Sequence, residues 1–194
     1  MKKIFLILLF FLTAVPFQAT ARQWTVDPVH TNFYFSIKHT YATVRGQFMD
    51  FSGKVIFDPA NPAASTFDFT IKTDSVNTNE SKRDTHLRSP EFFDAAAYPT
   101  ITFKSDRVRK KDDTLLQVNG TLTIKDVSKN ITLDFIYHGQ KDNPLMPGGI
   151  VAGFDARVTL DRLAYHVGDG KFYRMGVVGK DVDVLMTMEL MAEK

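Results

Sequence analysis

The sequence predicts an all-β protein: an antiparallel barrel of eight strands with a short helical segment near residues 80–93. Apolar and polar residues alternate over most of the chain after residue 31, which is the period of a half-buried strand. The alternating segments follow one another at the spacings of a barrel or sandwich, and not at those of βαβ units. Several run eight residues or more, which favours an up-and-down barrel because closure leaves no exposed sheet edge. A β-sandwich is the alternative, because periodicity alone does not separate the two folds.

The first 21 residues have the features of a secretory signal peptide. Two lysines precede an apolar run over residues 4–12, and Ala19-Thr20-Ala21 fits an A-x-A cleavage site. The apolar run is too short for a bilayer span, which needs roughly 20 residues, so an uncleaved membrane anchor is the weaker alternative. We expect cleavage after Ala21, a mature domain over residues 22–194, and a periplasmic or secreted location.

The charge and the cysteine content indicate which classes of function and which kind of stabilisation to expect. The chain has 24 Lys and Arg against 22 Asp and Glu, and loss of Lys2 and Lys3 with the signal peptide leaves 22 of each. A neutral mature chain without a basic stripe is not typical of a nucleic-acid-binding protein. Because cysteine is absent, disulfides cannot hold the fold. About 170 residues in one domain can instead bury roughly 70% of the unfolded chain's surface.

The strands are predicted from the parity of their apolar residues. The clearest alternation covers residues 31–39, and it resumes over 44–48. It then continues over 51–57 with the parity shifted by one near Asp50, which indicates a bulge or a sharp bend inside a long strand. The other strands are expected over 67–73, 101–103, 116–124, 131–137, 152–160 and 182–190.

Residues 79–88 lack this alternation and predict a short helix. Asn79 is the expected N-cap, Glu80 lies in the first turn and Arg88 in the last, and Pro90 ends the helix. The segment is either a plug that closes one end of the barrel or a lid over a ligand entrance, and the two interpretations are compatible. The aromatic residues expected to face the barrel are Phe92, Phe93 and Tyr98.

Several motifs spread in order over the mature chain support a more specific interpretation. The first group is Trp24-Thr-Val-Asp27-Pro28-x-His30-Thr31, Phe35-x-Ile37-x-His39 and Val44-Arg-Gly46-x-Phe48. The second is Arg83-Asp84-x-His86-Leu87-Arg88-Ser-x-x-Phe92-Phe93-Asp94 followed by Tyr98-Pro99-x-Ile101-x-Phe103. The third is Gly120-x-Leu122-Thr123-Ile124 and Gly179-x-Asp181-Val182. Together they resemble the YceI-like polyisoprenoid-binding family.

The resemblance implies an extended, lipocalin-like barrel with a long internal tunnel, in a family whose members are exported and some of which bind isoprenoids or other amphiphilic lipids. The residues expected to line the tunnel are Phe33, Phe35, Ile37, His39, Phe69, Phe103, Leu122, Phe135 and Phe154. Those expected in the lid or rim are Arg83, Asp84, Leu87, Arg88, Phe92 and Phe93. The chain departs from the family at Lys125–Val127, where a glycine often precedes the valine, and residues 162–174 lie in a variable region.

The predicted function is therefore that of a carrier, with an isoprenoid or similar amphiphilic lipid as its partner. Transient membrane contact and a homodimer are left open. The chain has no HExxH, GxSxG, P-loop or dinucleotide-binding motif, so we expect no catalytic residues, no metal and no cofactor. The alternatives are an exported enzyme that uses His39 with a nearby carboxylate, and a structural β-domain with a solid core.

Overall fold

A computed structural model describes residues 21–194, so the predicted signal peptide lies outside the described residues apart from Ala21. The strands are β1 (Arg22–Val26), β2 (Asn32–His39), β3 (Ala42–Phe48), β4 (Phe51–Phe57), β5 (Thr66–Lys72), β6 (Val76–Asn77), β7 (Thr100–Lys110), β8 (Leu115–Ile124), β9 (Val127–Asp142), β10 (Gly149–Asp161) and β11 (Val178–Glu193). The helices are α1 (Ser81–Arg88) and α2 (Lys171–Arg174), with 3-10 turns η1 (Pro62–Ala64), η2 (Thr73–Ser75) and η3 (Arg162–Tyr165). Neither helix in this part of the chain has the length and apolar character of a membrane span.

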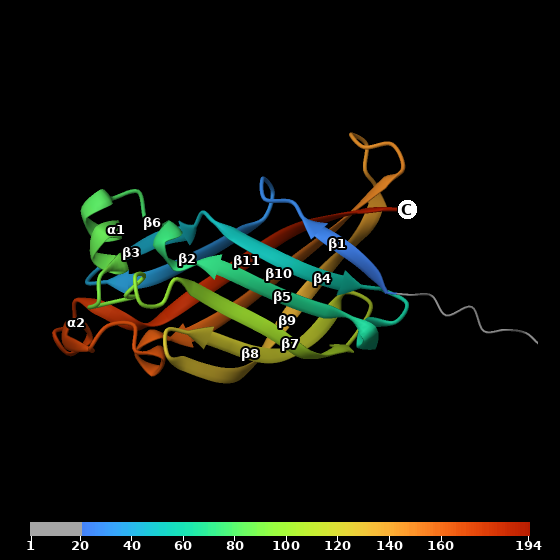
Figure 1. The fold of residues 1–194 in the computed structure, drawn as a ribbon. Helices are drawn as coiled ribbons and strands as arrows, with labels where there is room; N and C mark the ends of the chain where they lie inside the picture. The colour runs from blue at the N-terminus through green and yellow to red at the C-terminus, as the bar shows by residue number, and fades with distance from the viewer. Residues whose placement is uncertain (1–20) are drawn as a thin grey trace, which may run out of the picture.

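The strands form one antiparallel sheet that closes on itself (Figure 1). The order β1-β4-β5-β7-β8-β9-β10-β11 returns to β1, because β11 pairs with β1 as well as with β10. Along the rest of its length β11 pairs with β2, which pairs with β3, which pairs with β6. Three of the eight barrel strands are therefore interrupted: β1 continues as β2, β3 as β4, and β5 as β6. The predicted eight-stranded barrel is confirmed, and the sandwich alternative is wrong.

The interruption between β3 and β4 is the parity shift predicted near Asp50. Phe48 ends β3 and Phe51 begins β4, and both pack against the interior. The ring centroids of Phe51 and Phe33 are 5.0 Å apart, and those of Phe48 and Phe35 are 5.7 Å apart. Met49 between them is exposed. The shift therefore keeps aromatic side chains inside the barrel on both sides of the bend.

The interruption between β1 and β2 is bridged by hydrogen bonds to β11. Pro28 has no N–H to give to the sheet. The Asp27 N–H donates to the Glu189 carbonyl at 2.9 Å. The Thr31 hydroxyl lies 3.2 Å from both the carbonyl and the amide nitrogen of Glu189, so a side chain replaces the missing backbone partner. The ladder is thus continued across the break.

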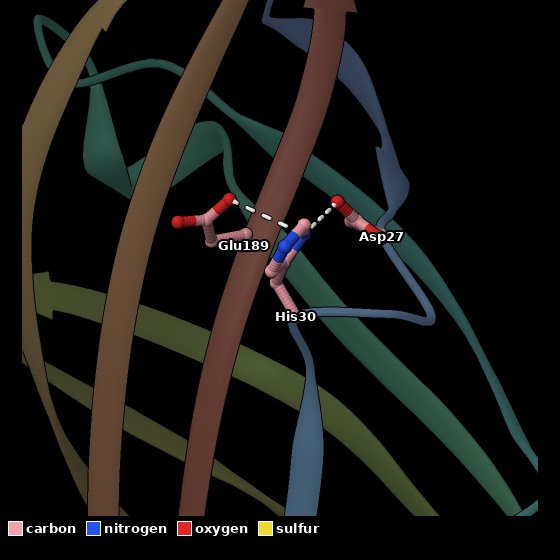
Figure 2. A group of neighbouring side chains, drawn as sticks. All are labelled: Asp27, His30 and Glu189. Atoms are coloured by element: carbon pink, nitrogen blue, oxygen red, sulfur yellow. Dashed lines mark hydrogen bonds and ion pairs between the residues drawn. The ribbon is translucent and has the colours of Figure 1, made fainter.

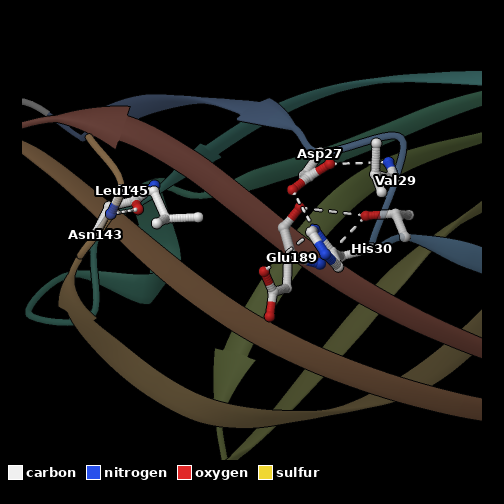
Figure 3. A network of polar contacts seen from close by, with 7 residues as sticks. Asp27, Val29, His30, Asn143, Leu145 and Glu189 are labelled. Atoms are coloured by element: carbon white, nitrogen blue, oxygen red, sulfur yellow. Dashed lines mark hydrogen bonds and ion pairs between the residues drawn. The ribbon is translucent and has the colours of Figure 1, made fainter.

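Turns closed by a hydrogen bond from a backbone N–H to a side-chain oxygen occur in the break between β1 and β2. One also occurs in a loop at the end of the barrel away from the helices (Figure 3). Asp27 Oδ1 accepts from the Val29 N–H at 2.8 Å. Between β9 and β10, Asn143 Oδ1 accepts from the Leu145 N–H at 2.9 Å in the same way. Asp and Asn favour such turns because their short side chains reach the backbone two residues further along the chain.

His30 pairs with Asp27 on the outer side of the break (Figure 2). His30 Nδ1 lies 2.7 Å from Asp27 Oδ2 and 3.9 Å from Glu189 Oε2. The hydrogen bond from His30 holds the pKa of Asp27 below its usual value. The same bond, with the negative charge of Asp27, raises the pKa of His30. The pair therefore connects the two ends of the short segment between β1 and β2.

The end of the barrel where β1 begins has a solid aromatic core. Its members pack edge-on or tilted, with ring centroids 5.0 to 6.0 Å apart, and each is at most 1% exposed. Such aromatic pairs stabilise a core beyond the area that they bury. These residues are Phe57, Phe67, Phe135 and Phe154. Trp24 closes over them and donates from Nε1 to the Phe57 carbonyl at 3.0 Å.

The His30–Asp27 pair predicts a pH-dependent contribution to stability. The raised pKa of His30 gives stability that is fully present below about pH 6.5 and is lost as the pH rises through the folded-state pKa. The lowered pKa of Asp27 gives stability that is present above about pH 3.9 and is lost as the pH falls through its folded-state pKa. The difference in unfolding free energy between wild type and His30→Asn should therefore be largest between about pH 4 and 6.5 and smaller at pH 8.

Urea unfolding at pH 5, 6, 7 and 8 measures this difference, and Asp27→Asn should give a similar profile. A difference that is constant across this range would contradict the assigned pair.

Candidate functional site

A cavity of about 480 Å³ lies inside the barrel beneath α1. This volume is within the range of about 300–1,000 Å³ typical of small-molecule sites. Inward-facing apolar residues in this half, such as Phe35, Ile37 and Leu160, are only half-buried, whereas Phe135 and Phe154 in the opposite half are 0% exposed. The barrel is therefore hollow at the helical end and solid at the other.

Most of the residues predicted to line a tunnel border this cavity. The strands β2, β5, β7 and β8 carry them on their inner faces, at alternate positions. Those that border the cavity are Phe33, Phe35, Ile37, His39, Phe69, Phe103 and Leu122. The structure places Phe135 and Phe154 elsewhere, in the aromatic core beyond the cavity floor.

Two glycines make room for aromatic rings in the cavity wall. Gly46 lies opposite Phe35, and a Cβ atom at Gly46 would lie 2.5 Å from Phe35 Cζ and 2.8 Å from the Asn77 carbonyl. A Cβ atom at Gly120 would lie 2.7 Å from Phe103 Cζ. Each glycine therefore leaves the space that a ring from the neighbouring strand occupies. These contacts give the two motif glycines a role in shaping the wall.

Helix α1 covers the open end of this half, as Figure 1 shows. It begins one residue later than predicted: Glu80 is the N-cap, and its carboxylate accepts from the Lys82 and Arg83 N–H groups. Asn79, the predicted cap, instead has a left-handed backbone with φ of 59°. A carboxylate at this position stabilises the helix because it faces the positive end of the helix dipole.

Three charged residues tie α1 to the interrupted strand formed by β5 and β6. Asp84 is buried, and its Oδ1 accepts from the N–H and the hydroxyl of Thr78 at 2.8 and 2.5 Å. Arg83 donates to the hydroxyl and the carbonyl of Thr78 at 2.7 and 2.9 Å. Arg88 donates to the carbonyls of Asp74 and Val76 at 2.7 and 3.1 Å. Asp84 and Arg88 therefore anchor the helix and do not border the cavity, whereas Arg83 does both.

Residues 81–93 are called the lid from here on. Their apolar side chains point into the cavity. Leu87, Phe92 and Phe93 all border it. Phe93 packs edge-on against Phe48 with centroids 5.7 Å apart. Phe92 stacks on Phe172 of α2 at 6.2 Å. The lid and α2 therefore contribute to one apolar roof.

Residues outside the predicted site also build this end. Lys125 in the β8–β9 turn donates from Nζ to the carbonyls of Phe92 and His166 at 2.9 and 2.8 Å, which joins the lid to the segment after η3. Arg162 and Phe172, from the region treated as variable, border the cavity. The departure from the family pattern over residues 125–127 was the only signal for Lys125, and alternation gave none for Arg162 because β10 ends just before it.

The cavity lining is polar mainly near the lid. Its cationic residues are Lys82, Arg83 and Arg162, its histidines are His39 and His86, and within residues 21–194 no carboxylate borders it. The floor is formed by residues such as Phe33, Phe69 and Met186. The cavity can therefore hold an apolar chain with a polar end under the lid, and it offers no base–carboxylate pair for acid–base chemistry.

Only one group of potential metal ligands stands out in the part of the chain described. Donor atoms of Asp27, His30 and Glu189 lie within 4.8 Å of one another, on the outer side of the barrel and away from the cavity lining. His30 Nδ1 already has a partner in Asp27 at 2.7 Å. The hydrogen bonds across the β1–β2 break account for this cluster as a structural link.

The hollow and solid halves predict different costs for the same substitution. Phe135→Ala should lower the unfolding free energy by about 3–5 kcal/mol, because the ring is fully buried. Phe35→Ala should cost about 1–2 kcal/mol, because one side of the ring faces the cavity and has fewer contacts to lose. Chemical denaturation of both variants measures the two costs. Equal losses at both positions would contradict a hollow half beneath α1.

The sequence and the fold match known proteins. The YceI-like domain model matches residues 24–190. Protein YceI of Escherichia coli O157:H7 is 37% identical over 179 residues, which is 91% of this chain and 90% of the relative. The crystal structure of Campylobacter jejuni YCEI protein aligns with a TM-score of 0.69 and 32% identity, and covers 81% of this chain and 89% of that chain.

A third match has the same fold at lower identity. It is a polyisoprenoid binding domain from Saccharophagus degradans implicated in plant cell wall breakdown, with a TM-score of 0.66, 18% identity, and coverage of 87% of this chain and 98% of that one. None of the three is named for an enzymatic activity. The family model covers most of the chain, and the E. coli relative exceeds 30% identity across nearly its whole length. The chain therefore belongs to the YceI-like family.

Proposed function

We propose that this protein is an exported carrier that holds a long-chain isoprenoid or a similar amphiphilic lipid inside its barrel. The observation that supports this most directly is the cavity itself, a space of about 480 Å³ lined by apolar side chains from strands around the barrel and roofed by the lid. Each buried CH₂ group contributes about 0.8 kcal/mol, so an enclosed apolar space favours a long hydrocarbon chain strongly over water. The structural match to a polyisoprenoid binding domain is consistent with such a cargo at the level of the fold.

Export is supported by the first 21 residues. Their basic start, short apolar run and A-x-A site are the signature of a cleaved signal peptide. The proposed location of the mature protein is the periplasm, where an apolar lipid needs a carrier to cross an aqueous space. Absence of cysteine is compatible with this location, because the aromatic core holds the fold without disulfides.

The rim next to the lid is suited to brief contact with a membrane. Tyr41 in the β2–β3 turn is 101% exposed, and Met175 after α2 is 62% exposed. The two segments are joined by a hydrogen bond from the Thr40 N–H to the Val177 carbonyl at 2.8 Å, so both belong to the same rim. Exposed aromatic and apolar residues beside a lipid cavity are well placed to meet the membrane interface when cargo is exchanged.

The two alternatives account for the cavity less well. An enzyme using His39 needs a carboxylate partner, and within residues 21–194 none borders the cavity. A structural β-domain needs a solid core, but only the half of the barrel around Phe135 and Phe154 is solid.

Native purification followed by organic extraction and mass spectrometry tests the carrier function. We expect a retained prenyl or acyl compound at a stoichiometry near one per chain, because the cavity beneath the lid is a continuous apolar space of about 480 Å³. A lipid that is added and recovered chemically altered would favour the enzyme. Preparations that repeatedly contain no lipid and bind none when it is supplied would contradict the carrier function.

A gating role for the lid predicts faster lipid exchange in Asp84→Ala. The substitution removes the acceptor for both Thr78 donors, and a hydrogen bond to a charged group contributes about 1.5–3 kcal/mol. We expect transfer of a fluorescent prenyl analogue to vesicles to accelerate about tenfold or more, while the barrel melts only slightly earlier. Asp84→Asn keeps the Oδ1 acceptor, so its transfer rate should lie between those of wild type and Asp84→Ala.

Phe92→Ala combined with Phe93→Ala should weaken retention through the lost apolar roof, measured by stopped flow in the same assay. If all these variants exchange at the wild-type rate while losing several kcal/mol of stability, the segment is a plug and not a gate.

A further inference from the structure

Arg162 is a buried cation in the wall of the cavity. It follows directly after β10, at the start of η3, and is 7% exposed. Its Nε donates to the Gly179 carbonyl at 2.8 Å, and its Nη1 donates to the Val167 carbonyl at 2.7 Å. Its Nη2 is buried and has no hydrogen-bond partner among residues 21–194. Two of the three nitrogens thus fix the guanidinium in place, and the third has unused donors.

A buried guanidinium with an unused donor is destabilising unless a partner completes it. Burial lowers the pKa of Arg162 from its usual value. The nearest acidic groups act on it without pairing with it: Asp161 accepts from Lys180 Nζ at 3.0 Å, and Asp169 accepts from the Lys171 N–H at 2.7 Å. Neither Asp161 nor Asp169 borders the cavity. Within residues 21–194, therefore, no carboxylate forms a hydrogen bond or ion pair with Arg162.

The surroundings of Arg162 are those of a head-group site. The guanidinium carbon lies 5.9 Å from the centre of the Phe92 ring, so Arg162 lies directly under the lid. Lys82 and Arg83 border the same end of the cavity, and the apolar floor lies away from it. A chain inserted with its tail toward the floor would leave its polar end beside these three cations.

We propose that the cavity selects amphiphiles with an anionic head group, a carboxylate or a phosphate, which the guanidinium of Arg162 binds under the lid. The proposal rests on the carrier function and specifies its cargo. Carboxylates and phosphates are acceptor-only groups that match the donor geometry of arginine, and charge-assisted hydrogen bonds are about twice as strong as neutral ones. A neutral alcohol of the same chain length gains no such pairing.

Equilibrium binding to the mature chain, stripped of bound lipid, tests this with two chain-matched pairs of probes. One pair is palmitate and hexadecan-1-ol, and the other is farnesyl phosphate and farnesol, all below the concentrations at which they aggregate. We expect the anion to bind about 10- to 100-fold more tightly than the alcohol in at least one pair. The pair with the larger ratio identifies whether the carboxylate or the phosphate is the preferred head group.

Variants assign the preference to Arg162. Arg162→Gln should lower the affinity for the anion to that for the alcohol, and Arg162→Lys should keep part of the preference because it retains the charge without the planar fork. Arg109→Gln, on the exposed outer face of β7, is the matched control and should behave as wild type. If Arg162→Gln does not fold, the wild-type comparison of anion with alcohol decides alone.

Three results would overturn the proposal. Equal binding of anion and alcohol in both pairs would show that the cavity binds lipids without selecting the head group, and would leave the carrier function intact. A folded Arg162→Gln variant with the full preference would place the selectivity elsewhere. Failure of all four probes and of extracted lipid to bind would remove the carrier function, and the head-group preference with it.

Discussion

Pairing along β11 is the constraint on which the rest of the structure depends. One edge of this strand pairs with β10, and the other must pair with β1 near the chain's end and with β2 further back. A barrel closes only if that second edge is continuous, because an unpaired stretch leaves backbone donors and acceptors without partners. Asp27 and Thr31 fill the gap opposite Glu189. The residues on either side of the interruption are thus also those that allow the barrel to close.

The other two interruptions have consequences for the cavity. The bend between β3 and β4 turns Phe48 inward next to the lid and Phe51 inward further down. The bend between β5 and β6 leaves the carbonyl of Asp74 available, β6 ends just before Thr78, and α1 is bound to both residues. The lid is therefore held by backbone groups that a regular strand would have used in hydrogen bonds to the neighbouring strand. These irregular segments provide the groups that bind the lid, and the uninterrupted strands β7 to β11 form the rest of the barrel wall.

The sequence predicted the strands, the parity shift and the short helix well, because each depends on local periodicity or capping chemistry. It did not separate barrel from sandwich, since closure is a property of which strands pair and not of any one strand. It also grouped Phe135 with Phe35, because both alternate inward and only the packing around them distinguishes a core from a cavity wall. Arg162 was missed for a related reason: its role depends on unpaired donors, which only three-dimensional contacts reveal.

The solid end of the barrel limits the length of a chain that the cavity can hold. Because Phe57, Phe67 and Phe154 fill the far end of the barrel, the cavity is closed at that end. Under the proposed carrier function, a chain would enter from the lid end with its tail first and leave with its head group first. The distance from the aromatic floor to the roof would then limit the length of the bound chain, and a longer chain would fold back on itself or leave its head group outside.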